Sequence, residues 1–187
     1  MSTWCPSAVA ATRCSGLLLS LLIAAGCTRS AATLELIAAF SDDTAVGELN
    51  ATWRDTGEER PGSAPNTRER KVIFRVDAVN RLSDPLYLGL RDLRLLGPAG
   101  ALAVPGAVAC ALAPGTTPGL LSGAVWVPAR DAPGIHGFEI SRFAVPLSER
   151  GRAFYREFLL RQRPGAAAAI DEEMAAYAAA APCRAAN

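Results

Sequence analysis

Apolar side chains recur at every second position between residues 71 and 80, and this pattern limits the fold more than any other feature of the chain. On an extended chain, the repeat places one set of side chains on a single face: Val72, Phe74, Val76 and Ala78. Arg75 and Asp77 fall on the opposite face. An alternation of period two indicates a β-strand with one buried side, so a second layer must cover that side.

Turn-forming residues follow this strand, and similar signals separate further strands. Asn80 and Asp84 can hydrogen-bond the local backbone, and Pro85 presets its own φ angle, so residues 80–85 are expected to form a turn. We expect the other strands at residues 33–40, 48–53, 86–90, 91–96, 120–127 and 135–146. In the last of these, the side chains expected to point inward are Phe138, Ile140 and Phe143.

The last quarter of the chain changes to a helical pattern. Ser148 can cap a helix at residues 149–162, which has an acidic residue in its first turn. The apolar face of this helix is expected to hold Phe154, Phe158 and Leu159, with Tyr155 beside them. Pro164 and Gly165 end it, and an alanine-rich second helix is expected over residues 166–181.

Several short strands separated by turns favour an antiparallel β-sandwich. Within residues 70–100, a strand is followed by a turn with Asn80 and Ser83-Asp84-Pro85, a second strand and a strand that ends at Gly97, and this succession resembles small extracytoplasmic immunoglobulin-like modules. The resemblance implies a mainly β fold, an immunoglobulin-like antiparallel β-sandwich, which is followed in this chain by C-terminal α-helices.

A short apolar segment at the start of the chain predicts its location. Residues 17–25 are almost all apolar and lie between Gly16 and Gly26, and Cys27 follows directly. A helix needs about 20 apolar residues to cross a bilayer, so this segment fits the apolar core of a signal peptide instead. The small residues at the end of this segment, followed by Gly26 and Cys27, resemble the lipobox of bacterial lipoproteins. This resemblance implies that Cys27 is acylated. The alternative is an ordinary signal peptide with a cysteine nearby by chance.

The anchor sets the expected organisation of the chain. We expect a signal peptide at residues 1–26, an acylated cysteine and short tether at 27–32, a β-sandwich at 33–147 and a helical segment packed on it at 148–187. Thr28 follows the cysteine, which in the enteric sorting pattern favours the outer membrane. The expected location is therefore the cell envelope, membrane-anchored and facing the periplasm.

Charge and cysteine usage narrow the functions further. The chain has 19 basic and 18 acidic side chains, and Arg13 is the only charged side chain before Cys27. The mature chain therefore lacks the basic excess of a nucleic-acid-binding protein. Cys110 and Cys183 remain in an oxidising compartment, which favours a disulfide between them, with two unpaired thiols as the alternative. No metal or cofactor site is expected, because the sequence has no CxxC pair and no histidine cluster.

Two groups of titratable side chains are candidates for catalysis. His136 is the only histidine and would serve as a general base, but no nucleophile motif lies near it, so we expect a turn position. Asp171, Glu172 and Glu173 are adjacent, and neighbours on a helix point about 100° apart. We expect them on a solvated face near the start of the second helix, and we predict no catalytic residue.

Three segments are candidates for surfaces or loops. Residues 104–121 are apolar and rich in glycine and proline, and they either pack on the core or bind a partner, with Trp126 as an anchor in either case. The arginine-bearing helix at residues 149–162 either packs on the sandwich or lies on anionic lipid. Residues 56–70 are expected to form a charged, mobile loop.

These features predict a lipid-anchored cell-envelope protein that acts without catalysis as a binding or assembly module. It would contact the membrane through Cys27 and a protein partner through the sandwich, as part of a secretion or envelope complex. The alternative is a small periplasmic ligand-binding or hydrolytic lipoprotein with a cleft between sandwich and helices. The hydrolytic form needs His136 and a carboxylate to converge in a hollow.

Overall fold

The computed structural model describes residues 29–41 and 44–186. The alternating segment lies in the strand β3 (Arg68–Asn80), and its predicted inward side chains are each at most 5% exposed: Val72, Phe74, Val76 and Ala78. The other elements are β1 (Arg29–Ile37), β2 (Ala45–Pro61), β4 (Leu86–Gly97), β5 (Gly100–Ala103), β6 (Val108–Leu112), β7 (Gly115–Pro128), the 3-10 helix η1 (Ala132–Gly134), β8 (Gly137–Pro146), α1 (Glu149–Gln162) and α2 (Ala167–Ala178).

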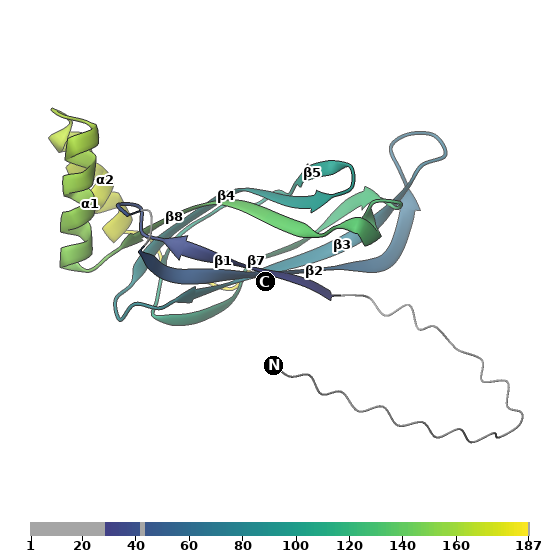
Figure 1. The fold of residues 1–187 in the computed structure, drawn as a ribbon, viewed down its shortest axis with the longest axis horizontal. Helices are drawn as coiled ribbons and strands as arrows, with labels where there is room; N and C mark the ends of the chain where they lie inside the picture. Colours follow the sequence, from purple (N-terminus) through teal and green to yellow (C-terminus); the bar gives the residue numbers. More distant parts are fainter. Residues whose placement is uncertain (1–28, 42–43, 187) are drawn as a thin grey trace, which may run out of the picture.

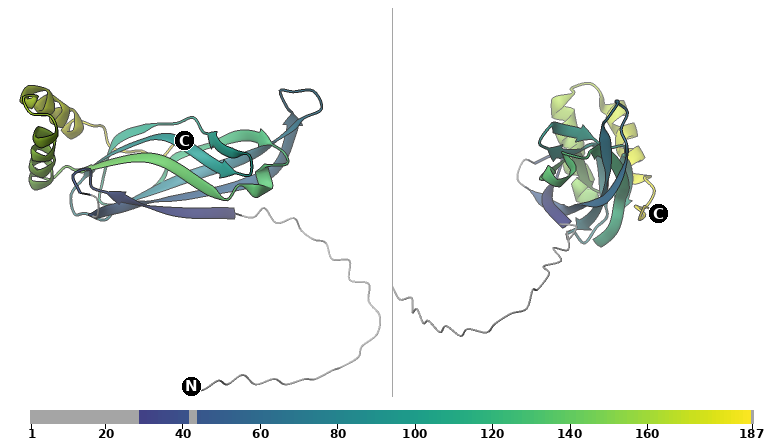
Figure 2. Two further views of the ribbon diagram at one scale, coloured as in Figure 1. Left: turned by 45° about the horizontal axis from the view of Figure 1, so that its top comes forward. Right: turned by 90° about the vertical axis from the view of Figure 1, so that its right-hand side faces the viewer.

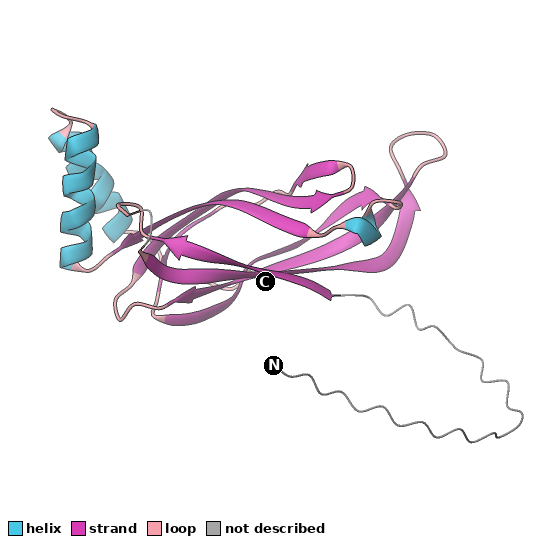
Figure 3. Ribbon diagram, viewed as in Figure 1, coloured by secondary structure: helices cyan, strands magenta, loops and turns pink. Residues whose placement is uncertain are grey.

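The strands form two antiparallel sheets, and this confirms the predicted β-sandwich with C-terminal helices (Figure 3). The first sheet has the order β1-β2-β3-β7. In the second, β4 pairs with β8 on one side and with β6 and β5 on the other. The sandwich is elongated, and both helices lie at one end (Figure 1). Residues 70–100, which carry the immunoglobulin-like resemblance, run from β3 in one sheet to β4 in the other.

Each long edge of the sandwich is closed by other parts of the chain. At the β1–β8 edge, the backbone N–H of Ala39 donates to the carbonyl of Ala144 at 2.8 Å. At the β6–β7 edge, the C-terminal tail crosses from one sheet to the other, with its end beside the two layers (Figure 2). There the N–H of Cys183 donates to the carbonyl of Ala111 at 2.9 Å, and the N–H of Ala186 donates to that of Gly119 at 2.7 Å.

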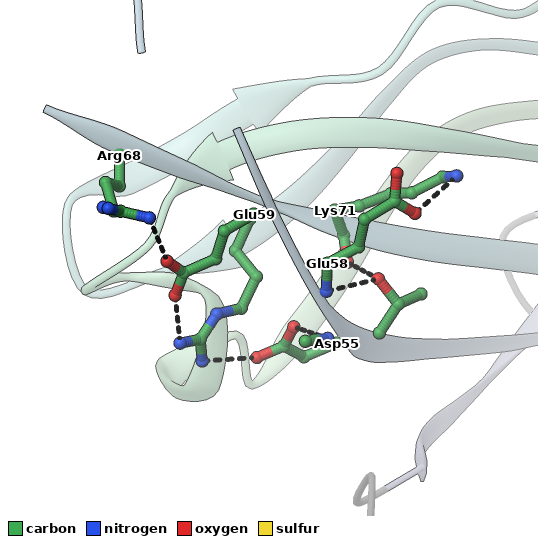
Figure 4. A network of polar contacts seen from close by, with 8 residues as sticks. Asp55, Glu58, Glu59, Arg68 and Lys71 are labelled. Carbon is green, nitrogen blue, oxygen red and sulfur yellow. Dashed lines mark hydrogen bonds and ion pairs between the residues drawn. The ribbon is translucent and has the colours of Figure 1, made fainter. Parts of the chain in front are cut away.

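The charged segment at residues 56–70 differs from the predicted mobile loop. It continues β2 and β3 into a long hairpin that extends past the end of the sandwich (Figure 1). Ion pairs hold its two strands together. Figure 4 shows Arg70 with Asp55 and Glu59, Arg68 with Glu59, and Lys71 with Glu58. Arg60 also pairs with Glu69. The hydrogen bond from Arg70 lowers the pKa of Glu59 below its ordinary value. Opposite charges on facing strand positions therefore replace the apolar alternation that marks a half-buried strand.

The apolar segment at residues 104–121 is also more regular than predicted, since it contains β6 and the start of β7. Cys110 and Leu112 point into the core, with 7% and 0% of their surface exposed. The chain's own tail lies along this segment, joined to it by a disulfide between Cys110 and Cys183. The C-terminal tail therefore covers part of the apolar surface that was expected to bind a partner.

Candidate functional site

A groove of about 540 Å³ lies on the outer face of the second sheet, where the helices pack against one end of β4 and β8. We call it the helix groove. Its lining includes Tyr87, Gly89 and Arg91 of β4, Ser141, Arg142 and Phe143 of β8, Tyr155 of α1, and Glu173 and Tyr177 of α2. The hollow is therefore built by β4 together with β8, α1 and α2 from later in the chain.

The floor of the helix groove is open because β4 carries a glycine there. Gly89 lies opposite Phe143 in the β4–β8 pairing. A Cβ added to Gly89 would lie 3.7 Å from the Phe143 Cβ, which is ordinary van der Waals contact. Its neighbours Leu88 and Leu90 point the other way and are buried in the core. A larger side chain at Gly89 would thus fit the backbone and fill the groove.

Local sequence places α1 directly at the end of β8. The Ser148 Oγ accepts a hydrogen bond from the N–H of Gly151 at 3.2 Å, which confirms the predicted cap. A Cβ on Gly151 would lie only 2.6 Å from the Cβ of Pro146, so glycine allows the first turn to pack against the strand end. Gly165, with φ of 87°, lets the chain turn back into α2.

Aromatic side chains from both strands and both helices pack together at the groove. The ring centroid of Phe143 lies 5.7 Å from those of Tyr155 and Tyr177. The Tyr87 ring lies 4.3 Å from Tyr177 and 6.2 Å from Phe143. Two predictions are wrong here. Phe143 points outward, because it has the opposite parity to the inward residues of β8, and Tyr155 faces the sheet while Phe154 is 46% exposed.

Glu173 is held between two donors at the groove wall. The Tyr177 hydroxyl donates to one carboxylate oxygen at 2.5 Å, and the Arg163 guanidinium donates to the other at 2.8 Å. Burial acts to raise the pKa of Glu173, but the bonds from Tyr177 and Arg163 outweigh it, so this pKa lies below its ordinary value. Burial and the bond to Glu173 raise the pKa of Tyr177 well above its ordinary value.

Replacing Glu173 with glutamine is expected to lower the free energy of unfolding at pH 7 by about 1 kcal/mol, because two charge-assisted hydrogen bonds are weakened. Since the folded-state pKa is depressed, the stabilisation exists above the ordinary value of 4.5 and is lost as pH falls through the folded-state pKa. Urea unfolding at neutral and acid pH measures the difference. Glu172→Gln, a change on an exposed neighbour, is the control, and equal effects of both variants would contradict the prediction.

A second hollow, of about 350 Å³, continues the helix groove along β8 and shares Ser141 and Arg142 with it. The Arg142 Nε donates to the carbonyl of Glu35 at 2.6 Å, and Arg142 forms no ion pair within residues 29–41 and 44–186. Arg91 has 80% of its side chain exposed, and its Nε lies 3.7 Å from a carboxylate oxygen of Asp92, beyond hydrogen-bond distance.

The acidic triad on α2 lies partly on the solvated face that its sequence predicts, since Asp171 and Glu172 are exposed and Glu173 is half-buried. Asp171 accepts two hydrogen bonds from Arg156, at 2.6 and 3.2 Å, and Glu173 pairs with Arg163. Only Glu172 is exposed without a described partner. These pairs form because α1 turns its arginines toward α2, so the carboxylates join the two helices.

His136 lies at the opposite end of the sandwich from the helices, beside η1. It is exposed, and its Nδ1 lies 3.0 Å from the carbonyl of Gly134. A nearby apolar hollow of about 170 Å³ is lined in part by Asp131 and Ile135, without His136. Within the described part of the chain, no hydrogen bond or ion pair joins His136 to a carboxylate. The convergence that the hydrolytic alternative needs is therefore not found there.

The groove residues were not predicted as a site, although one signal for them exists in the sequence. The inward positions of residues 86–90 are leucines, and the outward positions are Tyr87 and Gly89. A solvated face would carry charged or polar residues at those positions, so an aromatic residue and a glycine indicate a face that something covers. The covering residue Tyr177 comes from a helix far along the chain, which local pattern cannot identify.

No family model, curated protein or solved structure matches this chain. Cys27, the predicted lipidation site, lies outside the described residues. Within residues 29–41 and 44–186, neither helix has the length and apolar character needed to span a bilayer. The same residues contain no group of three or more His, Cys, Asp or Glu side chains placed to hold a metal ion.

Proposed function

We propose that this chain is a non-enzymatic, lipid-anchored binding module of the cell envelope that holds an extended segment of a partner protein in the helix groove. In this proposal Cys27 carries the acyl chains, the sandwich faces the periplasm, and Thr28 favours the outer membrane. The observation that supports it is the helix groove itself, an open hollow with aromatic and arginine side chains at one end of the sandwich.

The groove lies far from the proposed point of attachment. β1 begins at Arg29, two positions after Cys27, so the tether is shorter than the 27–32 segment predicted from sequence. From there β1 runs about 26 Å toward the helices (Figure 1), where Ala38 pairs with Ala144 shortly before α1. An anchor at Cys27 therefore presents the groove away from the bilayer. The arginines of α1 then face partners rather than headgroups.

The side chains in the groove favour binding. Tyrosine and arginine are the residue types that concentrate binding energy at interfaces, and the groove lining contains three tyrosines and two arginines. Its one carboxylate, on Glu173, is engaged by Tyr177 and Arg163. The acyl anchor adds to this by raising the local concentration of the module near membrane-associated partners.

The shape favours an extended segment. The two hollows that share Ser141 and Arg142 follow β8 from Phe143 to Phe138. This stretch of strand is about 16 Å long and matches about five residues of an extended peptide. A partner segment lying along β8 would place alternate side chains in the helix groove and reach the second hollow, which is lined by Leu34 of β1 as well as by β8.

Photocrosslinking in intact cell envelopes tests both halves of the proposal, with a photoreactive residue replacing Ser141. Cys27→Ala is expected to move the protein to the soluble fraction. Gly89→Leu is expected to remain on the membrane and to lose its crosslinked partner, because leucine fills the groove without meeting the backbone. Ala124→Leu makes a comparable change on an exposed position of β7, in the other sheet, and should retain the crosslink.

Each half of the proposal has its own contrary outcome. Unchanged membrane fractionation of Cys27→Ala would remove the lipid anchor. A crosslinked partner that persists in Gly89→Leu would remove the groove as the binding site. Thermal unfolding of each variant shows whether a lost crosslink reflects a lost fold.

A second candidate function is the binding of a small ligand in the same groove. The observation in its favour is the volume of about 540 Å³, which lies within the range of small-molecule sites, roughly 300–1,000 Å³. Native mass spectrometry of the purified chain separates the two functions. A bound small molecule that is absent from Gly89→Leu would favour this candidate over a protein segment.

A further inference from the structure

We infer that the helix groove selects an acidic segment, in which a carboxylate side chain lies two positions from a large apolar or aromatic side chain. The inference rests on the proposed function, since it names the chemistry of the partner held in the same groove. Two observations carry it: the charge of the groove that is left without a partner, and the distance of that charge from the aromatic floor.

The unmatched charge in the groove is positive. Arg142 forms no ion pair in the described residues, and Arg91 has only Asp92 at 3.7 Å. The single carboxylate in the lining, on Glu173, is neutralised by Arg163 at 2.8 Å. The Arg91 guanidinium therefore faces the hollow with its hydrogen-bonding capacity largely unused, whereas Arg142 pairs with the inward-pointing Leu90 and donates to Glu35 of β1 at the sheet edge. A carboxylate is the group that fits the Arg91 guanidinium, because it can accept two parallel hydrogen bonds from one arginine.

The spacing between Gly89 and Arg91 along β4 determines how far apart the apolar and the acidic side chains of the ligand must lie. Gly89 pairs with Phe143, and two positions along β4 Arg91 pairs with Ser141. Strand residues two positions apart are separated by about 7 Å and point to the same side. Alternate side chains of an extended ligand have the same spacing. An apolar side chain over Gly89 therefore brings the side chain two positions along next to Arg91.

The same arrangement discriminates against other segments. A basic side chain in the second position would face Arg91 at short range, and like charges brought together at an interface cost affinity. A purely polar segment would leave the aromatic floor uncovered and gain little from burial. An acidic segment with one large apolar side chain satisfies both parts of the groove.

Selection from a library of random displayed peptides against the full chain tests the inference. The selected peptides are expected to carry aspartate or glutamate two positions from a large apolar residue. Fluorescence anisotropy with a selected peptide should show affinity reduced about tenfold in Arg91→Gln, the effect of losing one charge-assisted hydrogen bond. Arg54→Gln, on an exposed arginine of β2 in the other sheet, should bind as the wild type does.

The outcomes separate this inference from the proposed function. Peptides that lose binding in Gly89→Leu, yet lack acidic residues or keep their affinity in Arg91→Gln, would overturn the acidic preference and leave the groove as a binding site. If no selected peptide is sensitive to Gly89→Leu, both the inference and the groove fail. Unfolding midpoints equal to the wild type establish that each variant is folded.

Discussion

Replacing Cys110 and Cys183 together with serine is expected to lower the free energy of unfolding by about 4 kcal/mol. The two cysteines are 73 positions apart, so their bond closes a long loop and removes conformational freedom from the unfolded chain. Native domains are stable by only roughly 5–15 kcal/mol. A loss of this size would therefore leave the sandwich marginal.

The disulfide also maintains contacts that depend on the position of the tail. Cys183 is flanked by backbone hydrogen bonds that join the tail to Ala111 on β6 and to Gly119 on β7. The tail begins shortly after α2, the helix that supplies Tyr177 to the groove. Loss of the bond is thus expected to loosen both the β6–β7 edge and one wall of the groove.

Urea unfolding of the oxidised wild type and of the double serine variant measures the effect on stability. Hydrogen exchange at the Ala111, Cys183 and Ala186 amides measures the effect on the tail, and faster exchange is expected at all three. Ala109→Ser, an exposed change on the same strand as Cys110, is the control for the introduction of serine. Equal urea midpoints for the double variant and the wild type would show that the tail is held without the bond.

The sequence predicts the structure correctly where a local pattern and the tertiary packing agree. Residues 71–80 alternate because one face of β3 is buried, and the inward set is read directly from the period. Ser148 caps α1 through a contact only three residues away. In both cases the physical cause lies within the segment itself, so the sequence of that segment is sufficient to predict it.

Prediction failed where a distant part of the chain determines the environment. The hairpin at residues 56–70 is held by charges on facing strands, which have no apolar period to detect. Phe143 and Tyr87 face outward because two helices near the C-terminus cover them. The helix groove is a property of that non-local packing, and only the unusual outward pair of Tyr87 and Gly89 indicates it in the sequence.

Asn80→Asp is expected to destabilise the fold by about 4 kcal/mol at pH 7, the range for a buried charge without a partner. Asn80 is 2% exposed and makes three hydrogen bonds. Its side-chain amide donates to the carbonyls of Asp84 at 2.9 Å and Leu112 at 3.0 Å, and its oxygen accepts from the N–H of Leu82 at 2.9 Å. It thus fastens the predicted turn and joins β3 in one sheet to β6 in the other.

The change replaces the donating NH₂ group with an oxygen that faces two carbonyl oxygens, so two hydrogen bonds become repulsive contacts. Burial among those carbonyls raises the pKa of the introduced carboxyl above its unfolded value of about 3.9. The variant should therefore approach the wild type below that pH and lose stability as pH rises through the folded-state pKa. Urea unfolding of both proteins across pH measures this dependence. Asn66→Asp, the same chemical change at an exposed turn residue, should show neither the loss of stability nor its pH dependence. A loss of stability in Asn80→Asp that does not depend on pH would mean that the buried amide is not the donor to both carbonyls.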